Sequence, residues 1–257
     1  MATAVFFHAH PDDEAIATGG TMARVAAEGH RVVLVCATRG ELGEVAEGFL
    51  ADGEALGDRR VEEVQAAGAV LGAQRVAFLG YRDSGMDGEP TTKDPECFAM
   101  ADPEEAAGRL ATILREETAE VLTVYDERGG YEHPDHVKVH SVGLRAAELA
   151  GTPRVYLATV SRQHFEAMSA RHLQTPDSPE PPATDVELGV DEARITTVVD
   201  VRSVLPRKRA AMAAHATQIQ DSSFFLSLPD DAFTDVFGTE WFIRLGADPD
   251  QREHWLF

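Results

Sequence analysis

Histidines and aspartates gather in two short segments of this sequence, and each segment follows a run of apolar residues. Residues 8–14 read HAHPDDE, and residues 131–136 read YEHPDH. Either segment alone is typical of a helix start, because proline suits the first turn and acidic side chains suit the positive end of a helix. Together they supply the imidazoles and carboxylates that a metal site needs, although about 120 residues separate them.

Zinc is the metal that these residue types favour. A catalytic zinc takes three protein ligands, commonly two histidines and a carboxylate, and lowers the pKa of a bound water to about 7. His10 and Asp13 lie three positions apart across the expected strand-to-helix turn, and His136 can complete the set. His8 competes with His10, since residues two apart on a strand face the same side. We favour His10 because it lies nearer the strand end.

Two groups then stay free for proton transfer. Asp12 lies beside a ligand and can act as a base, and His133 lies three residues before His136. Asp135 supplies a carboxylate that can orient and stabilise an imidazolium at His133. The two segments therefore contain ligands, a base and an acid for metal-assisted hydrolysis.

Alternating strands and helices must position these segments. Apolar, β-branched runs predict strands over residues 4–8, 31–37, 75–79, 121–125 and 154–159. Helical spacing predicts helices over residues 13–28, 59–71, 102–118 and 134–149. This order predicts an α/β fold with a mostly parallel sheet and helices on both faces. In such sheets ligands bind beyond the carboxyl ends of the strands, which is where both segments begin.

The chain changes character after the fifth expected strand. Residues 175–182 read TPDSPEPP, which indicates a proline-rich hinge, and a helix is expected over 206–220. We expect a Rossmann-like three-layer catalytic core over residues 1–172, a hinge over 173–185 and a small C-terminal α+β subdomain over 186–257 that packs on the core.

Acidic residues outnumber basic ones in this chain. It has 44 Asp and Glu against 23 Lys and Arg, which gives a net charge of −21. Such a field repels phosphate, so we expect neither nucleic acid nor an anionic membrane as a partner. The N-terminal residues lack the basic and long apolar regions of a signal peptide, and we expect a cytoplasmic protein. No glycine-rich phosphate loop follows the first strand, so we expect no nucleotide cofactor.

The sequence resembles a known family at these same segments. Residues 9–14 (AHPDDE) and 133–136 (HPDH) are similar to the two boxes of the LmbE-like (PIG-L) zinc-dependent N-acetylglucosamine deacetylases. The likeness is strongest to the actinobacterial branch that acts in the mycothiol pathway as deacetylase or conjugate amidase, and it covers roughly residues 3–220. Four further stretches carry it: residues 38–44 (TRGELGE), 60–63 (RVEE), 82–86 (RDSGM) and 208–218 (KRAAMAAHATQ).

The resemblance implies a role for each site residue. It implies one Zn²⁺ per chain, with Fe²⁺ as an alternative in the cell, held by His10, Asp13 and His136. It implies Asp12 as the general base, and His133 as the charged or acidic partner with Asp135 behind it. Arg60 and Asp83 would face the sugar, and Tyr131 would lie near the amide oxygen. His215, on an alanine-rich stretch, we interpret as a packed or surface residue.

The function that follows is hydrolysis of an amide on a small amino sugar. Water activated by Asp12 at the zinc would remove the acetyl group from an N-acetylglucosaminyl-type sugar or glycoside. An alternative keeps the metal site and cleaves a larger N-acyl group, as in mycothiol conjugates. A third hypothesis is a non-catalytic sugar-binding protein, which would have lost the base or a ligand, whereas all of these residues are present. The sequence does not indicate the oligomeric state.

Overall fold

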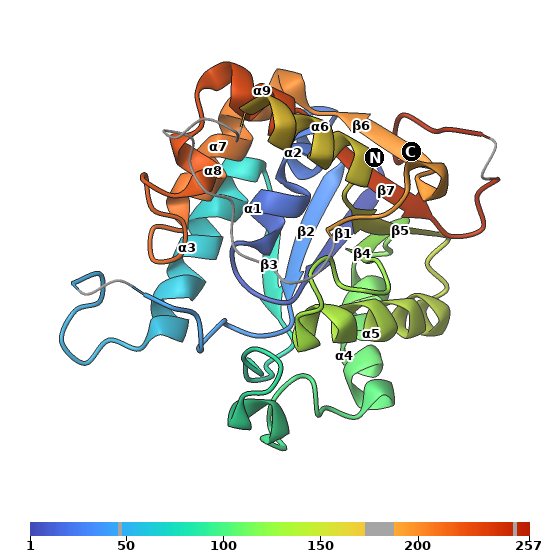
Figure 1. Ribbon diagram of the computed structural model, residues 1–257. Helices are drawn as coiled ribbons and strands as arrows, with labels where there is room; N and C mark the ends of the chain where they lie inside the picture. The colour runs from blue at the N-terminus through green and yellow to red at the C-terminus, as the bar shows by residue number, and fades with distance from the viewer. Residues whose placement is uncertain (46–47, 173–187, 249–250) are drawn as a thin grey trace.

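A single mixed sheet lies at the centre of the molecule. The computed structural model describes residues 1–45, 48–172, 188–248 and 251–257 (Figure 1). Within these residues seven strands pair in the order β3-β2-β1-β4-β5-β7-β6. They are β1 (Thr3–His8), β2 (Arg31–Cys36), β3 (Arg75–Phe78), β4 (Val121–Tyr125), β5 (Arg154–Thr159), β6 (Thr197–Asp200) and β7 (Thr239–Arg244). The first five are parallel, and β7 runs antiparallel to both β5 and β6.

Helices cover both faces of the sheet (Figure 1). One layer contains α1 (Asp13–Ala17), α2 (Gly19–Ala27), α3 (Leu56–Leu71) and α7 (Leu205–Ala214), and the other contains α4 (Pro103–Glu116) and α5 (Pro134–Ala150). The remaining helices are α6 (Arg162–His172), α8 (Phe224–Ser227) and α9 (Asp230–Phe237), with short 3₁₀ turns at η1 (Pro90–Lys93), η2 (Glu192–Arg194) and η3 (Arg202–Val204). No helix among the described residues is long and apolar enough to cross a membrane.

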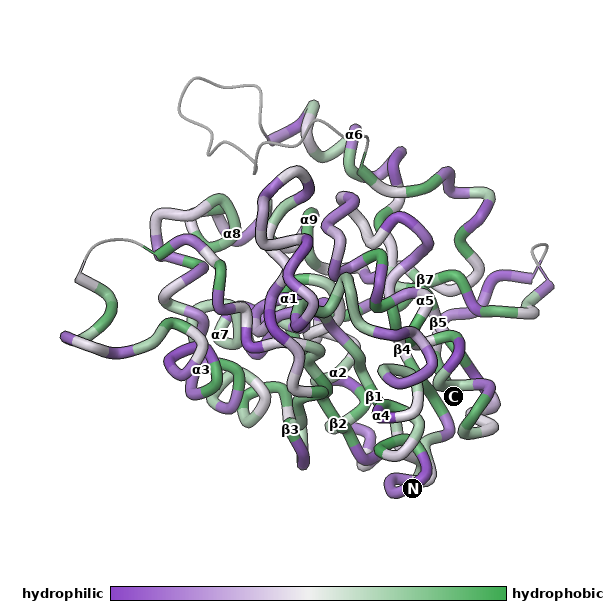
Figure 2. Tube along the Cα trace, turned by 90° about the horizontal axis from the view of Figure 1, so that it is seen from below, coloured by the Kyte–Doolittle hydropathy of each residue, from purple (hydrophilic) through white to green (hydrophobic). Residues whose placement is uncertain are grey.

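The central strands are apolar on both faces, as a sheet between two helical layers requires. In β1, Ala4 and Phe6 pack into the core beneath α2, α3 and α7, whereas Val5 and Phe7 pack into the core beneath α4 and α5. All four side chains are fully buried. The strands accordingly run as hydrophobic segments through a more polar surround in Figure 2. Strands buried on both faces are typical of parallel sheets, so the predicted α/β fold is confirmed.

The expected helix over residues 13–28 is two helices, because the backbone breaks at Thr18 (φ −135°). The break creates a second helix N-terminus, and the buried carboxylate of Glu240 accepts the N–H groups of Gly20 and Thr21 there, each at 2.8 Å. Gly20 is required at this point, since a Cβ would lie 2.5 Å from the Val201 side chain. The hydrophobic spacing does not indicate the break, and Glu240, which binds the new helix N-terminus, lies more than 200 residues away.

Strands from the C-terminal part of the chain extend the same sheet. Tyr156 of β5 pairs with Arg244 of β7, and a buried ion pair of 2.5 Å joins Lys208 of α7 to Glu240 of β7. The expected hinge over residues 173–185 lies outside the described residues, so the division into core, hinge and C-terminal subdomain stays a prediction.

Candidate metal centre

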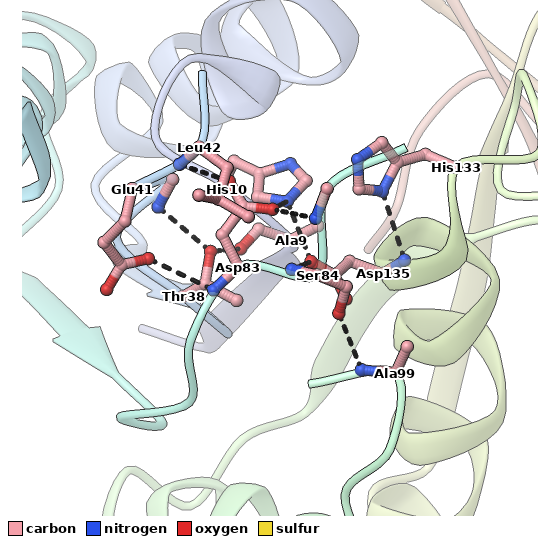
Figure 3. A network of polar contacts seen from close by, with 12 residues as sticks. Ala9, His10, Thr38, Glu41, Leu42, Asp83, Ser84, Ala99, His133 and Asp135 are labelled. Atoms are coloured by element: carbon pink, nitrogen blue, oxygen red, sulfur yellow. Dashed lines mark hydrogen bonds and ion pairs between the residues drawn. The ribbon is translucent and has the colours of Figure 1, made fainter. Parts of the chain in front are cut away.

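The two His/Asp segments start side by side at the carboxyl edge of the sheet. β1 ends at His8 and β4 ends at Tyr125, and these two strands are hydrogen-bonded neighbours. The first segment turns from β1 directly into α1, and the second ends the loop after β4 and forms the first turn of α5. The loop after β3 reaches the same place and brings Asp83 and Ser84 beside them (Figure 3).

Asp13 lies between two imidazoles. Its Oδ1 is 3.3 Å from Nε2 of His136, and its Oδ2 is 3.6 Å from Nδ1 of His10 and accepts the His10 backbone N–H at 2.8 Å. Both histidines are buried, with 7% of His10 and 4% of His136 exposed. This arrangement supplies two nitrogen atoms and a carboxylate, which is a donor set that zinc accepts.

His136 carries an unsatisfied nitrogen that a metal would satisfy. Its Nδ1 lies 3.1 Å from the carbonyl oxygen of Gly129, and because a carbonyl only accepts, the ring proton is on Nδ1. In the neutral ring the lone pair is therefore on Nε2, which is buried, lies 3.3 Å from Asp13 Oδ1 and makes no hydrogen bond among the described residues. Metal-ligating histidines commonly use one nitrogen for the metal and donate from the other in this way. The residues present thus fit the zinc ion that the family resemblance implies.

The surroundings of His10 favour positive charge. Burial lowers the pKa of His10, but hydrogen bonds with Asp13, Asp135 and Asp83 outweigh burial and raise it well above the ordinary value. Its Nε2 lies 3.1 Å from Asp135 Oδ2 and 3.5 Å from Asp83 Oδ1. Three carboxylates around one imidazole form a site that stabilises a bound cation.

Among the described residues two triplets bring their ligand atoms within 4.8 Å of one another, namely His10, His133 and His136, and His10, Asp83 and Asp135; the predicted set with Asp13 is not one of them. In these triplets the additional side chains already have partners. Asp135 accepts both the N–H and the hydroxyl of Ser84, and Asp83 accepts the N–H groups of Gly85 (2.9 Å) and Leu42 (3.2 Å) (Figure 3). His133 Nδ1 accepts the N–H of Asp135 at 3.1 Å. Asp13 likewise accepts a hydrogen bond, from the His10 N–H, so existing partners do not distinguish the sets, and His10, Asp13 and His136 stay our prediction for the metal ligands.

Asp12 is held in an unusual backbone conformation at the start of α1. Its φ is 109°, a region that non-glycine residues occupy at a cost of about 1–3 kcal/mol and that clusters at functional sites. Burial raises the pKa of Asp12 to about 6, although Arg60 opposes the increase. A carboxylate with a pKa near neutrality is suited to take up and return a proton.

Arg60 lies behind Asp12 rather than at the open side of the site. Its guanidinium donates to the carbonyl oxygens of Pro11 and Gly40 and lies 3.2 Å from Asp12 Oδ1, and only 3% of the residue is exposed. Gly40 must be glycine here, because its φ is 64° and a Cβ would lie 2.3 Å from Arg60 Nη1. The expected sugar contacts of Arg60 and Asp83 stay predictions.

Tyr131 is at the rim of the site. It is 38% exposed, and its ring contacts His136 with centroids 4.8 Å apart. A role near the amide oxygen stays a prediction for this side chain.

His8 is occupied by other partners. Its Nδ1 lies 2.8 Å from the Tyr125 hydroxyl and its Nε2 lies 2.9 Å from the Thr18 hydroxyl, and burial lowers its pKa to about 4. Both ring nitrogens are thus engaged, which supports His10 over His8 as a ligand. Tyr125 also stacks on His136, with centroids 4.6 Å apart.

Sequence reasoning missed three residues of the site. Tyr125 could have been found as the last residue of a strand that ends at the ligand edge, and Ser84 as part of the RDSGM stretch. Glu14 was treated as part of the AHPDDE box without a role, yet it is fully buried and accepts the N–H of Asp12 at 3.0 Å.

Comparisons with known proteins identify the family of this chain. A family model described as "PIG-L: GlcNAc-PI de-N-acetylase" matches residues 5–147. A protein of Thermobispora bispora named 1D-myo-inositol 2-acetamido-2-deoxy-alpha-D-glucopyranoside deacetylase is 41% identical, with 96% of this chain and 89% of the relative covered. A protein of Streptomyces avermitilis with the same name is 42% identical, with 91% and 89% covered.

Solved structures share the fold at low sequence identity. The N,N'-diacetylchitobiose deacetylase from Pyrococcus horikoshii superposes with a TM-score of 0.59 at 21% identity, with 95% of this chain and 83% of that chain covered. GalB, the 4-carboxy-2-hydroxymuconate hydratase from Pseudomonas putida KT2440, superposes with a TM-score of 0.63 at 21% identity, with 96% and 98% covered. Because one of these neighbours is named as a hydratase, the fold alone does not determine the reaction.

Proposed function

Since this chain belongs to the PIG-L family (GlcNAc-PI de-N-acetylase), we propose that it is a zinc-dependent hydrolase that removes the acetyl group from an N-acetylglucosaminyl glycoside. The observation that carries the proposal is Asp13 between the imidazoles of His10 and His136, with Asp12 next to it in the chain. The relatives that match nearly the full length are named as deacetylases of an N-acetylglucosaminyl-inositol, so we propose a small neutral glycoside of this kind as substrate.

His10, Asp13 and His136 would hold Zn²⁺, which when bound polarises the amide carbonyl and lowers the pKa of a water to about 7. Asp12 accepts a proton from the attacking water at a carboxylate oxygen. Arg60, 3.2 Å from Asp12 Oδ1, keeps that carboxylate oriented and partly compensates its charge. Asp12 therefore holds the proton between attack and departure of the amine.

His133 donates a hydrogen bond in this proposal. Its Nδ1 accepts the N–H of Asp135, so the proton of the neutral ring is on Nε2. An N–H group at Nε2 can stabilise the negative charge that develops on the amide oxygen. A neutral imidazole that gives up this proton would become an anion, so Asp12 rather than His133 returns the proton to the leaving amine.

A substrate panel tests the proposal. Zinc-loaded protein is incubated with N-acetylglucosaminyl glycosides, including the inositol glycoside, and the free amine is measured by mass spectrometry. We expect turnover by wild type and by the surface variant Asp58→Asn, and loss of turnover by Asp12→Asn. Full activity of Asp12→Asn, or of the protein after complete chelation of zinc, would refute the mechanism.

Cleavage of a larger N-acyl group at the same site is the second candidate. The observation that favours it is the 38% exposure of Tyr131 at the rim of the site. Side-by-side rates on N-acetyl and N-acylcysteinyl glucosaminyl-inositol separate the two, and we expect the acetyl compound to react faster.

A further inference from the structure

A buried ion pair behind the metal centre has no part in the mechanism above. His215 Nε2 lies 2.6 Å from Glu14 Oε1, and both residues are fully buried. Glu14 is the last residue of the first site segment and lies in α1, whereas His215 is the C-cap of α7, 201 residues later. Buried polar pairs that cross a fold in this way are costly to desolvate, which raises the question of what the pair does.

The second carboxylate oxygen of Glu14 connects this ion pair to Asp12. Glu14 Oε2 accepts the backbone N–H of Asp12 at 3.0 Å, and the Asp12 carbonyl accepts the N–H groups of Ala15 and Ile16. Asp12 has the largest φ of the non-glycine residues at positive φ in the described part of the chain. A backbone in that conformation persists only where its surroundings hold it, and Glu14 holds the amide.

We propose that His215 is a positioning residue that acts through Glu14 to fix the backbone of Asp12 and hence the direction of its carboxylate. The inference rests on the proposed function, in which Asp12 moves the proton. His215 orients one Glu14 oxygen, and the other oxygen then stays in line with the Asp12 amide. Loss of the His215 contact frees Glu14 to turn and allows Asp12 to relax toward an ordinary helix-start conformation.

The local structure of His215 is adapted to this task. We expected a helix over residues 206–220, and this expectation is wrong beyond Ala214, because His215 leaves the helix (φ −88°, ψ 51°) with its ring directed at Glu14. The residues that follow His215 form hydrogen bonds with neighbouring elements. Thr217 donates its N–H (2.9 Å) and its hydroxyl (2.6 Å) to Glu63, and Gln218 donates to the Glu44 carbonyl at 3.1 Å. The turn after α7 thus packs against both α3 and the loop after β2.

The ionisation of the pair agrees with the geometry. Burial lowers the pKa of His215, but the neighbouring Glu14 outweighs burial and raises it. Burial raises the pKa of Glu14, and His215 outweighs that effect and lowers it. Both shifts have the sign expected for a mutual stabilisation, and the 2.6 Å contact between His215 Nε2 and Glu14 Oε1 is their geometric counterpart.

The test compares two amide substitutions that differ only in reach. In His215→Gln the amide nitrogen takes the place of Nε2 and keeps the contact with Glu14, whereas in His215→Asn it takes the place of Nδ1 and falls short. We expect His215→Asn to lower kcat about 10²-fold with a change in KM below about threefold, since a misplacement of about 1 Å can cost that much. His215→Gln is expected to recover most of the loss. Zinc content, measured by mass spectrometry, stays at the wild-type value in both.

Two further variants distinguish a role of His215 in positioning Asp12 from a role in the stability of the fold. Glu14→Asp keeps the charge but cannot span His215 and Asp12, so it gives the same loss of kcat should His215→Asn not fold. Lys208→Met breaks the other buried ion pair of α7, whose partner Glu240 binds α2 and makes no contact with Asp12. It lowers the melting temperature while the zinc-loaded, folded enzyme keeps its kcat.

Crystal structures of the variants measure φ of Asp12 directly, without a substrate assay. We expect φ of Asp12 near 109° in wild type and His215→Gln, and outside the positive region in His215→Asn or Glu14→Asp. Unchanged kcat per zinc-loaded enzyme, or unchanged φ of Asp12, in the short variants would overturn the inference. If wild type hydrolyses none of the glycosides, the proposed function fails, and φ of Asp12 alone decides the positioning role.

Discussion

The same three residue types occur twice in the site with different outcomes. His10-Pro11-Asp12 follows β1, and His133-Pro134-Asp135 precedes the body of α5. In the first copy the aspartate is the N-cap of α1, with φ 109° and 18% of its side chain exposed. In the second copy the histidine is the N-cap, and Asp135 lies inside the first turn, fully buried. A shift of two residues in the helix start makes one aspartate accessible for proton transfer and turns the other into a fixed support.

The surroundings maintain this difference. Asp12 is held through its backbone and by Arg60, which leaves its carboxylate partly exposed. The Asp135 carboxylate is taken up by Ser84 and by His10 Nε2 (Figure 3). The His-Pro-Asp sequence alone therefore does not make its aspartate a general base. The role of the aspartate depends on the side chains from other elements that contact it.

The most direct test of the difference between Asp12 and Asp135 is to neutralise each aspartate in turn. Asp12→Asn removes the proton acceptor, and we expect kcat to fall about 10³-fold, within the range for loss of a general base. Asp135→Asn removes only support for His10, and we expect a loss of about 10- to 100-fold. Steady-state kinetics at matched zinc content measure both. Equal losses in the two variants would contradict the division of roles.

The contact with Ser84 can be weakened without touching Asp135 itself. Ser84→Ala removes the hydroxyl that donates to Asp135 Oδ1 and leaves the backbone N–H in place. We expect kcat to fall about tenfold, together with a weaker zinc affinity in chelator titrations. Ser141→Ala, on the exposed side of α5, is the control and keeps wild-type values.

The support that Arg60 gives to Asp12 can be tested by displacing the Arg60 guanidinium. Gly40→Ala places a Cβ 2.3 Å from Arg60 Nη1 at a residue with φ 64°, so it displaces the guanidinium that faces Asp12. Gly53 has a similar φ of 79° and open space around it, so Gly53→Ala carries the backbone strain without the clash. We expect both variants to lose about 1–3 kcal/mol of unfolding free energy. Only Gly40→Ala should also lose activity, by several-fold in kcat, roughly as expected for a slightly misplaced base.

The smallest effect is expected at an ion pair far from both His-Pro-Asp segments. Hydrogen bonds from Arg31 and Arg75 outweigh burial and lower the pKa of Glu117. Its stabilisation is present above the ordinary glutamate pKa and is lost as the pH falls through the lowered value. We expect Glu117→Gln to cost about 0.2–1 kcal/mol at pH 7, as for a surface pair, and less near pH 2. Denaturant unfolding at both pH values measures this, and an unchanged activity at pH 7 shows that the effect is remote from the site.

Local patterns were sufficient for the parallel part of the sheet and its helical layers, but not for β7 (Thr239–Arg244). Apolar β-branched runs predicted the five parallel strands, and their alternation with helices predicted two helical layers, because each pattern reflects burial of its own residues. The position of both His/Asp segments at the carboxyl edge followed from strand order alone. The resemblance of the AHPDDE and HPDH boxes then named the family that the full-length relatives support.

The features that local patterns missed depend on distant partners. Glu240 binds the N-terminus of α2 after the break at Thr18, and His215, just past the end of α7 at Ala214, contacts Glu14. The contrast between Asp12 and Asp135 depends on Arg60 and Ser84, which come from other elements. No local signal distinguishes two aspartates that both follow His-Pro, so this contrast required the three-dimensional structure.

The location of the metal tests the central claim most directly. Crystals of the zinc-loaded protein, measured on both sides of the zinc absorption edge, give an anomalous peak at the metal. The account predicts one peak in contact with His10, Asp13 and His136, with the Asp12 carboxylate directed at the metal's open side but not bound. A peak on His10, Asp83 and Asp135, or a metal ligated by Asp12, would contradict it.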